Sequence, residues 1–218
     1  MPSRRTSART FPDNPSGIHL LKDPAVVRRM IRSAQLDPQD LVVEFGAGTG
    51  KLTSQLSGTG ARIIAVERHP DLVARLERRF SEAENVRIVA GDARSVPLPR
   101  RPYAVVANIP YSISTSLFRR ILTPDQTALQ EADILVEWGF AKRVTAEQPR
   151  NFEIAWWQLR FELSIVGRVR PHSFAPPPSV DTAHLRIRRR SGVSAGLLQQ
   201  QERRLRQLYR PSRRLRRR

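Results

Sequence analysis

The four residues Asn108-Ile109-Pro110-Tyr111 form the most chemically specific pattern in the chain. An exocyclic amine of a nucleobase is a poor nucleophile, because its lone pair is delocalised into the ring. The side-chain oxygen of Asn108 and the carbonyl of Ile109 can accept the two amine hydrogens and stabilise the positive charge that develops on nitrogen. Pro110 fixes the turn, and the Tyr111 ring offers a stacking face for a flipped base. The motif predicts group transfer to such an amine; the alternative is an Asn-x-Pro turn beside a core tyrosine.

Three glycines, Gly46, Gly48 and Gly50, alternate in a short loop after an apolar run. Glycine lets the backbone turn tightly and come close to a ligand. The spacing differs from the Gly-x-Gly-x-x-Gly pattern of dinucleotide sites, and the Gly-Lys-Ser/Thr ending of a P-loop is missing. The loop therefore favours a nucleoside ligand without a pyrophosphate, although a plain strand-to-helix turn would use the same glycines.

Two acidic residues follow the next two apolar runs. Glu67 comes 17 residues after Gly50, and Asp92 lies in Gly91-Asp92-Ala93. An acid in the place of Glu67 can accept the hydroxyls of a ribose, and Asp92 can accept an adenine amino group. Taken singly, each is also compatible with a surface acid or an ordinary turn. Because the glycines and both acids follow successive strands, we expect them at one edge of one sheet.

Strand-like and helix-like stretches alternate around these motifs. Asp23-Pro24 begins a helix that ends by Pro38, and further helices are predicted at 51–56, 70–80, 114–122 and 140–145, with another after Asn151. Strands are predicted at 41–45, 62–66, 86–90, 103–107 and 134–138, and an antiparallel pair at 161–169 and 182–187 joined by a rigid proline turn. The alternation predicts βαβ units, and hence an α/β fold with a mostly parallel seven-stranded sheet and helices on both faces.

Composition limits the remaining classes. The chain has 218 residues and no cysteine, which excludes disulfide scaffolds, cysteine-ligated metals and thiol nucleophiles. Its apolar runs are far shorter than the roughly 20 residues of a membrane span, and no apolar segment typical of a signal peptide follows the basic N-terminus. We expect a monomeric cytoplasmic protein without a metal site.

The net charge of +18 comes from 38 basic and 20 acidic residues. Residues 186–218 hold 13 arginines and one acid, a net of +12, which leaves +6 for residues 1–185. Such an excess favours a polyanionic partner, and a solvated charged segment is the alternative. We divide the chain into a basic arm (1–17), a catalytic domain (18–190) and an Arg-rich C-terminal tail (191–218) with one short amphipathic helix. The arginines predicted to bind RNA are Arg4, Arg5, Arg203, Arg204, Arg206, Arg213 and Arg214.

Together these motifs resemble those of the S-adenosylmethionine-dependent rRNA adenine N6-methyltransferases, and most of all those of the Erm family of macrolide-resistance methylases. The resemblance covers about residues 17–190. Besides the motifs above, it includes the stretches Ser112–Thr115, Leu135–Arg143 and Phe174–Asp181. The run from Glu137 to Arg143 separates Erm-like proteins from their housekeeping dimethyladenosine transferase relatives.

The resemblance implies a Rossmann-like fold, S-adenosylmethionine as cofactor, and methylation of an adenine in the peptidyl-transferase region of large-subunit (23S) rRNA, which blocks macrolide, lincosamide and streptogramin B antibiotics. Tyr111 and Phe174 would sandwich the target adenine. His19 stands where the family has an asparagine, and Leu21 matches a family leucine. The residues implied to surround the cofactor are His19, Leu21, Gly46, Gly48, Glu67, Asp92, Ala93 and Asn108.

The sequence departs from the family in its C-terminal part, where the usual helical domain is reduced to about 27 residues after Ser191. The Arg-rich tail and the arm are therefore expected to hold the RNA. Three alternatives stay open: a noncatalytic RNA-binding protein on the same fold, a housekeeping small-subunit rRNA dimethyladenosine transferase, and methylation of another amine in DNA or a protein glutamine.

Overall fold

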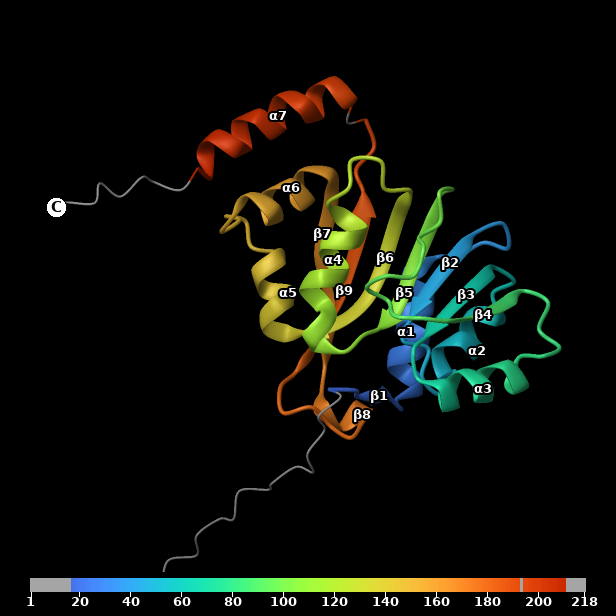
Figure 1. Cartoon of the computed structure of the whole chain (residues 1–218). Helices are drawn as coiled ribbons and strands as arrows, with labels where there is room; N and C mark the ends of the chain where they lie inside the picture. The colour runs from blue at the N-terminus through green and yellow to red at the C-terminus, as the bar shows by residue number, and fades with distance from the viewer. Residues whose placement is uncertain (1–16, 193, 211–218) are drawn as a thin grey trace, which may run out of the picture.

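The computed structural model describes residues 17–192 and 194–210, and a seven-stranded sheet forms its centre (Figure 1). The strand order is β4-β3-β2-β5-β6-β9-β7. The first five of these are parallel, and β9 runs antiparallel to both β6 and β7. This confirms the predicted mostly parallel sheet. The strands are β2 (Leu41–Phe45), β3 (Arg62–Glu67), β4 (Val86–Ala90), β5 (Tyr103–Asn108), β6 (Leu129–Glu137), β7 (Phe161–Val169) and β9 (Thr182–Arg189).

Helices cover both faces of the sheet, and each face has its own hydrophobic core. One core joins the sheet to α1 (Pro24–Ala34), α2 (Lys51–Ser57) and α3 (Pro70–Arg79). The other joins it to α4 (Ser114–Leu122), α5 (Trp138–Val144) and α6 (Phe152–Arg160). Every residue of β2 is buried, as expected for a central parallel strand between two helical layers.

The first helix begins with the predicted capping chemistry. The Asp23 carboxylate accepts a hydrogen bond from the Ala25 backbone N–H, with Pro24 at the first helical position, and Asn151 caps α6 in the same manner. The first helix ends at Ala34, earlier than Pro38 alone requires. Gln35 adopts a left-handed backbone with φ of 45° and closes it there.

One boundary prediction was wrong: the strand expected at 134–138 is β6, which begins at Leu129, while Trp138 already belongs to α5. Polar residues early in β6 hide the strand, because they break its apolar run. Asp133 is nevertheless buried, and its carboxylate meets the His184 ring at 2.7 Å and the Arg188 guanidinium at 3.1 Å, both from β9. Neighbouring strands thus satisfy the polar groups, which the local pattern cannot reveal.

A second, two-stranded sheet ties the start of the chain to its far end. β1 (Leu20–Leu21) pairs antiparallel with β8 (Phe174–Ala175), so that Leu20 lies opposite Ala175 and Leu21 opposite Phe174. The β1–β8 strap lies at the carboxyl ends of the parallel strands (Figure 1). Short 3-10 turns, Tyr111–Ile113 and Pro171–Ser173, flank the same region.

The predicted amphipathic helix of the C-terminal tail is α7 (Ala195–Leu208), which packs beside α6. Leu198 and Leu205 contact the α4–α6 core, and the Tyr209 hydroxyl donates to the Pro149 carbonyl at 2.7 Å. In Figure 1, α7 lies at the end of the sheet opposite β1 and β8. Within residues 17–192 and 194–210, none of the helices has the length and apolar character needed to cross a membrane.

Candidate active site

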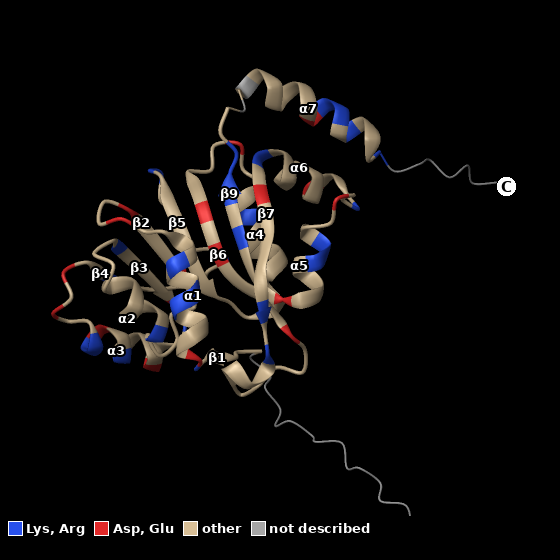
Figure 2. Cartoon of the chain, turned by 180° about the vertical axis from the view of Figure 1, so that it is seen from behind, with Lys and Arg blue, Asp and Glu red and all other residues tan. Residues whose placement is uncertain are grey.

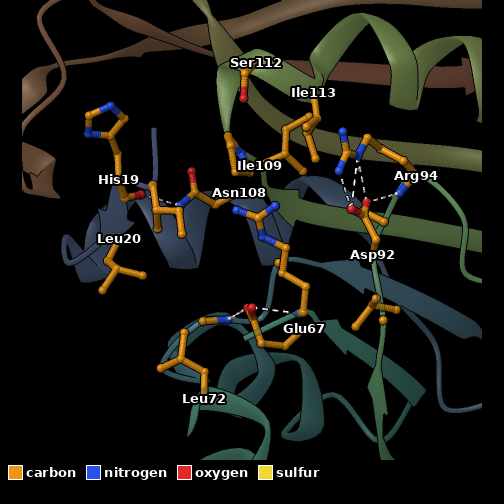
Figure 3. A pocket seen from close by; sticks show the side chains of 18 residues that line it. His19, Leu20, Glu67, Leu72, Asp92, Arg94, Asn108, Ile109, Ser112 and Ile113 are labelled. Carbon is orange, nitrogen blue, oxygen red and sulfur yellow. Dashed lines mark hydrogen bonds and ion pairs between the residues drawn. The ribbon is translucent and has the colours of Figure 1, made fainter. Parts of the chain in front are cut away.

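A cavity of about 230 Å³ opens at the carboxyl ends of β2, β3, β4 and β5, beneath the β1–β8 strap (Figure 3). Each of the four strands contributes the residues that follow or end it. The predicted cofactor residues that line the cavity are His19, Gly46, Gly48, Glu67, Asp92, Ala93 and Asn108. The structure therefore brings together every one of them except Leu21.

Two glycines of the loop leave space for the cavity, and the third leaves space for packing in the core. Gly46 and Gly48 have φ of 73° and 57°, and a Cβ on Gly48 would lie 3.1 Å from Leu20 Cδ2 of the strap. Gly50 also has positive φ, but a Cβ there would lie 2.8 Å from Leu76 Cδ2 of α3. Gly46 and Gly48 thus keep the cavity open, whereas Gly50 lets α2 and α3 pack closely.

Glu67 fixes the shape of this loop. Its buried carboxylate accepts hydrogen bonds from the backbone N–H groups of Gly48 (2.9 Å), Arg68 (2.8 Å) and His69 (2.9 Å). An ionised carboxylate has about four acceptor positions. Three are used by the backbone, so acceptor capacity is left for a hydroxyl in the cavity, which fits the ribose of a nucleoside.

Asp92 has a hydrogen-bond partner, Arg94, that the sequence motif did not predict. The Arg94 guanidinium and backbone N–H bind its carboxylate at 2.6 to 3.1 Å, and both side chains line the cavity (Figure 3). These hydrogen bonds lower the pKa of Asp92 to about 2. Asp92 is therefore an ionised acceptor at physiological pH, and Arg94 adds a planar cation to the wall.

Asn108 is held by the strap. Its side-chain Nδ2 donates to the His19 carbonyl at 2.8 Å, while no donor among the described residues reaches its Oδ1. The His19 ring nitrogen Nδ1 lies 2.8 Å from the Pro176 carbonyl, and the ring centroid lies 5.7 Å from that of Tyr111. The oxygen of Asn108 is thus oriented as a free acceptor next to the buried Ile109.

Tyr111 lies half-buried beside the cavity. Its hydroxyl makes a short hydrogen bond with Thr182 Oγ1, and burial raises its pKa, so the phenol stays protonated at neutral pH. Phe174 and Leu21 do not line the cavity. Leu21 and Phe174 are paired across the strap, so their side chains lie on the same face of it. Both point into the α1–α3 core, where Phe174 is 1% and Leu21 7% exposed. Leu20 lines the cavity instead.

Several residues that line the cavity were not predicted from the sequence. Leu72 of α3 and Ile113 after β5 supply apolar walls, and Arg68 joins Arg94 at the rim. Arg68 follows Glu67 by one residue and Arg94 follows Asp92 by two. Their closeness in sequence to predicted site residues is the signal by which both arginines could have been found. Apolar walls with a few convergent polar groups are typical of a nucleoside site.

Glu44 is another residue whose role was not predicted. It is 1% exposed, and its Oε2 accepts a hydrogen bond from Thr53 Oγ1 at 2.6 Å, which links β2 to α2 beneath the glycine loop. Burial raises its pKa to about 8. The side chain is therefore largely a neutral acid at pH 7, and it supports the loop rather than facing the cavity.

The predicted RNA-binding arginines fall in two regions. Arg203, Arg204 and Arg206 lie on α7, at the end of the sheet away from the cavity. Arg206 binds Glu202 at 2.6 Å and stacks over the Phe152 ring at 4.7 Å. Four further arginines lie outside the described residues: Arg4, Arg5, Arg213 and Arg214.

The sheet order, the cavity at the carboxyl ends of its parallel strands and the nucleoside-type residue set define the class of S-adenosylmethionine-dependent methyltransferases. The structure of the 23S rRNA methyltransferase ErmE superposes with a TM-score of 0.77 at 28% identity, covering 84% of this chain and 75% of that one. A dimethyladenosine transferase from Plasmodium falciparum has a TM-score of 0.76 at 24% identity, covering 88% and 70%, and shares the fold.

The chain belongs to the ribosomal RNA adenine dimethylase family, whose model matches residues 14–209. It is 34% identical over 177 residues to an rRNA adenine N-6-methyltransferase of Bacillus licheniformis, and spans 62% of that relative's length. It is also 35% identical over 187 residues to the ribosomal RNA small subunit methyltransferase A of Synechococcus sp. (strain JA-3-3Ab), of which it covers 67%. In each comparison 81% of this chain is aligned.

Proposed function

We propose that this protein transfers a methyl group from S-adenosylmethionine to the N6 amine of an adenine in ribosomal RNA. The observation that carries the proposal is the orientation of Asn108, whose Nδ2 is bound to the His19 carbonyl while its Oδ1 has no donor among the described residues. An acceptor fixed in this way can take a hydrogen from an incoming amine without rearranging. Family membership supports the same reaction.

The cofactor fits the residues that line the cavity. When bound, S-adenosylmethionine supplies a methyl group activated by the positive charge on sulfur. Glu67 has acceptor capacity left for the ribose hydroxyls, and Asp92 stays ionised and can accept from the adenine amine. Gly46 and Gly48 provide the space that side chains would fill.

The chain's own groups then act on the target amine. Asn108 Oδ1 and the Ile109 carbonyl accept its two hydrogens, which draws the nitrogen toward a tetrahedral arrangement and stabilises the positive charge that develops on it. As the N–C bond forms, the bond between sulfur and the methyl carbon would break, S-adenosylhomocysteine would leave as the neutral thioether, and one amine proton would pass to solvent. Tyr111 stacks on the flipped base. A strong general base is not required before attack, so positioning and electrostatics supply most of the rate enhancement.

We further propose large-subunit (23S) rRNA as the substrate, with resistance to macrolide, lincosamide and streptogramin B antibiotics as the consequence, and action as a monomer in the cytoplasm. The run Glu137–Arg143 supports this, as does the likeness to ErmE. The run forms the turn into α5 at the carboxyl end of β6, where the backbone N–H of Trp138 donates to the Asp181 carbonyl at 2.9 Å. Lys142 and Arg143 are exposed there. Small-subunit rRNA is the second candidate substrate, because the chain is also similar to the small subunit methyltransferase of Synechococcus.

The test is to incubate the full chain with methyl-labelled S-adenosylmethionine and, separately, large-subunit and small-subunit rRNA, and then to map the modified adenine by primer extension. We expect label on one adenine of the peptidyl-transferase region. Label on small-subunit rRNA alone would support the housekeeping role. Cofactor binding without label on either rRNA would point to another amine as substrate, and absence of cofactor binding to a noncatalytic RNA-binding protein.

A further inference from the structure

A second concave surface lies on the outer side of α1 and α2. It has a volume of about 350 Å³, and we call it the α1–α2 groove. Its lining includes four cationic residues, Lys22, Arg28, Lys51 and Arg79, and no acidic residue. All four are exposed. Figure 2 shows Lys and Arg segments on α1 and α3 on this side of the molecule.

The acid nearest to these cations in sequence, Asp23, forms no ion pair with any of them within the described residues. Asp23 stands beside Lys22, but its carboxylate accepts from the Ala25 backbone N–H at 2.9 Å and from Ser173 Oγ at 2.8 Å. It is therefore occupied by the α1 cap and the 3-10 turn before β8. Of the cations, Arg79 donates to the Thr49 carbonyl at 2.8 Å, and a hydrogen bond to a carbonyl leaves its charge uncompensated.

Helix stability does not account for the charge at this place. Lys51 is the first residue of α2, which has no acid at its cap or in its first turn, whereas at α1 the Asp23 cap offsets part of the charge of Lys22. Cations near a helix N-terminus are disfavoured by the helix dipole, by about 0.3–1 kcal/mol each. A bound anion would reverse that unfavourable interaction.

The groove adjoins the candidate active site. The strap passes from His19 and Leu20, which line the cavity, to Lys22, which lines the groove; the glycine loop likewise leads from Gly48 to Lys51. An extended chain rises about 3.3 Å per residue. Lys22 follows Leu20 by two residues and His19 by three, so the two surfaces lie within about 10 Å of each other along the strap. That distance is within reach of nucleotides that flank a flipped base.

We propose that the α1–α2 groove binds the phosphodiester backbone of the RNA substrate next to the target adenine. The inference rests on the proposed function for the identity of the RNA. It assigns the phosphate contacts near the site to the helical layer of α1 and α2, in addition to the arginines of the arm and of α7. Each phosphate neutralised by a groove cation would release condensed counterions and make binding salt-dependent.

The test measures binding of the full chain to a fluorescent transcript of the peptidyl-transferase region across a salt series. The groove variant is Lys22→Gln/Arg28→Gln/Lys51→Gln; Arg79 is kept because it holds Thr49. A matched variant, Arg87→Gln/Arg100→Gln/Arg101→Gln, removes the same charge from exposed positions on β4 and in the loop before β5. A third, Lys22→Arg/Arg28→Lys/Lys51→Arg, keeps the groove charge.

We expect the slope of log affinity against log salt to become shallower by about 2–3 in the groove variant, and affinity to fall on the order of 100-fold near 0.1 M salt. The other two variants should keep the wild-type slope. Unfolding temperature should not fall, and cofactor affinity should stay unchanged, in all three. Equal slopes in the groove variant and the wild type, or an equal loss in the Arg87 variant, would overturn the proposal. Wild-type protein that binds this RNA through the groove yet transfers no methyl group would instead overturn the proposed function.

Discussion

The two ends of the central sheet differ in how they hold their functional groups. At the carboxyl end, Glu67 and Asn108 are each fixed by hydrogen bonds to backbone groups, and Asp92 is paired with Arg94. At the opposite end, α7 presents Arg203 and Arg204 to solvent, and it is attached mainly through two leucines and the Tyr209 hydroxyl. The first arrangement suits selection of one atom, and the second suits contact with a diffuse polyanion.

Most of the positive charge that dominates the composition lies outside the cavity. The net charge of +18 predicts a polyanionic partner, yet the cavity lining combines two acids and an amide with two arginines, Arg68 and Arg94, and Arg94 is paired with Asp92. Base selection and RNA affinity are therefore expected to respond to different substitutions. Variants at the two ends of the sheet can test that separation.

The largest effect is expected at the cavity, from Asn108→Ala. It removes one of the two acceptors for the target amine, so the rate of methyl transfer at saturating RNA and cofactor should fall by about 10³-fold, comparable to loss of one preorganised electrostatic contact. Single-turnover transfer of labelled methyl measures it. Cofactor affinity should change far less, although the bond to His19 is also lost. Wild-type transfer rates in this variant would remove Asn108 from the reaction.

At the opposite end, removal of residues 192–218 should weaken RNA binding by about 100-fold near 0.1 M salt and flatten its salt dependence. The transfer rate at saturating RNA should be unchanged, because α7 does not contribute to the cavity. A second variant that ends at Arg210 keeps the Leu198 and Leu205 contacts, and so separates lost charge from lost packing. An unchanged salt slope in both variants would show that the tail binds no phosphates.

The pH dependence of stability reports on Glu44, which supports the glycine loop at the cavity end of the sheet. Its folded-state pKa of about 8 lies above its usual value, so the folded protein holds a proton that the unfolded chain loses. Its contribution to stability is complete below about pH 4.5 and is lost as pH rises to about 8. Between pH 6 and 8.5 the free energy of unfolding should fall by about 2–3 kcal/mol from this group. Urea unfolding of Glu44→Gln should lack this part of the decrease; an identical pH dependence would contradict the assignment.

The smallest effect is expected from Arg94→Ala. Loss of its side-chain hydrogen bonds should return the pKa of Asp92 from about 2 toward the ordinary value near 4, although the backbone N–H of residue 94 still donates to the carboxylate. Cofactor affinity should then change only severalfold at pH 7, but should weaken as pH falls toward 4, where the wild type stays constant. Calorimetry at pH 7 and pH 3.5 measures it. Equal pH dependence in both proteins would mean that Asp92 does not contact the cofactor.

The motifs predicted the sheet, the helices and most of the cavity, because each local pattern agrees with the fold around it. The β1–β8 strap could not be predicted in this way. It pairs residues about 155 positions apart, and that pairing decides that Leu20 faces the cavity while Leu21 and Phe174 face the core. The start of β6 was missed for a related reason, since Asp133 is satisfied only by residues of β9. In both places the structure depends on pairing between residues far apart in the sequence, which a local sequence pattern does not contain.

The central claim is that the carboxyl end of the sheet is an S-adenosylmethionine site shaped by Glu67. The most direct measurement is calorimetric titration of S-adenosylmethionine into the full chain and into Glu67→Gln, with the unfolding temperature of each recorded. We predict one cofactor per chain for the wild type and at least tenfold weaker binding for the variant, because an amide cannot accept all the backbone N–H groups and a ribose hydroxyl together. Absence of binding to the wild type, or equal affinity in a folded variant, would contradict the account.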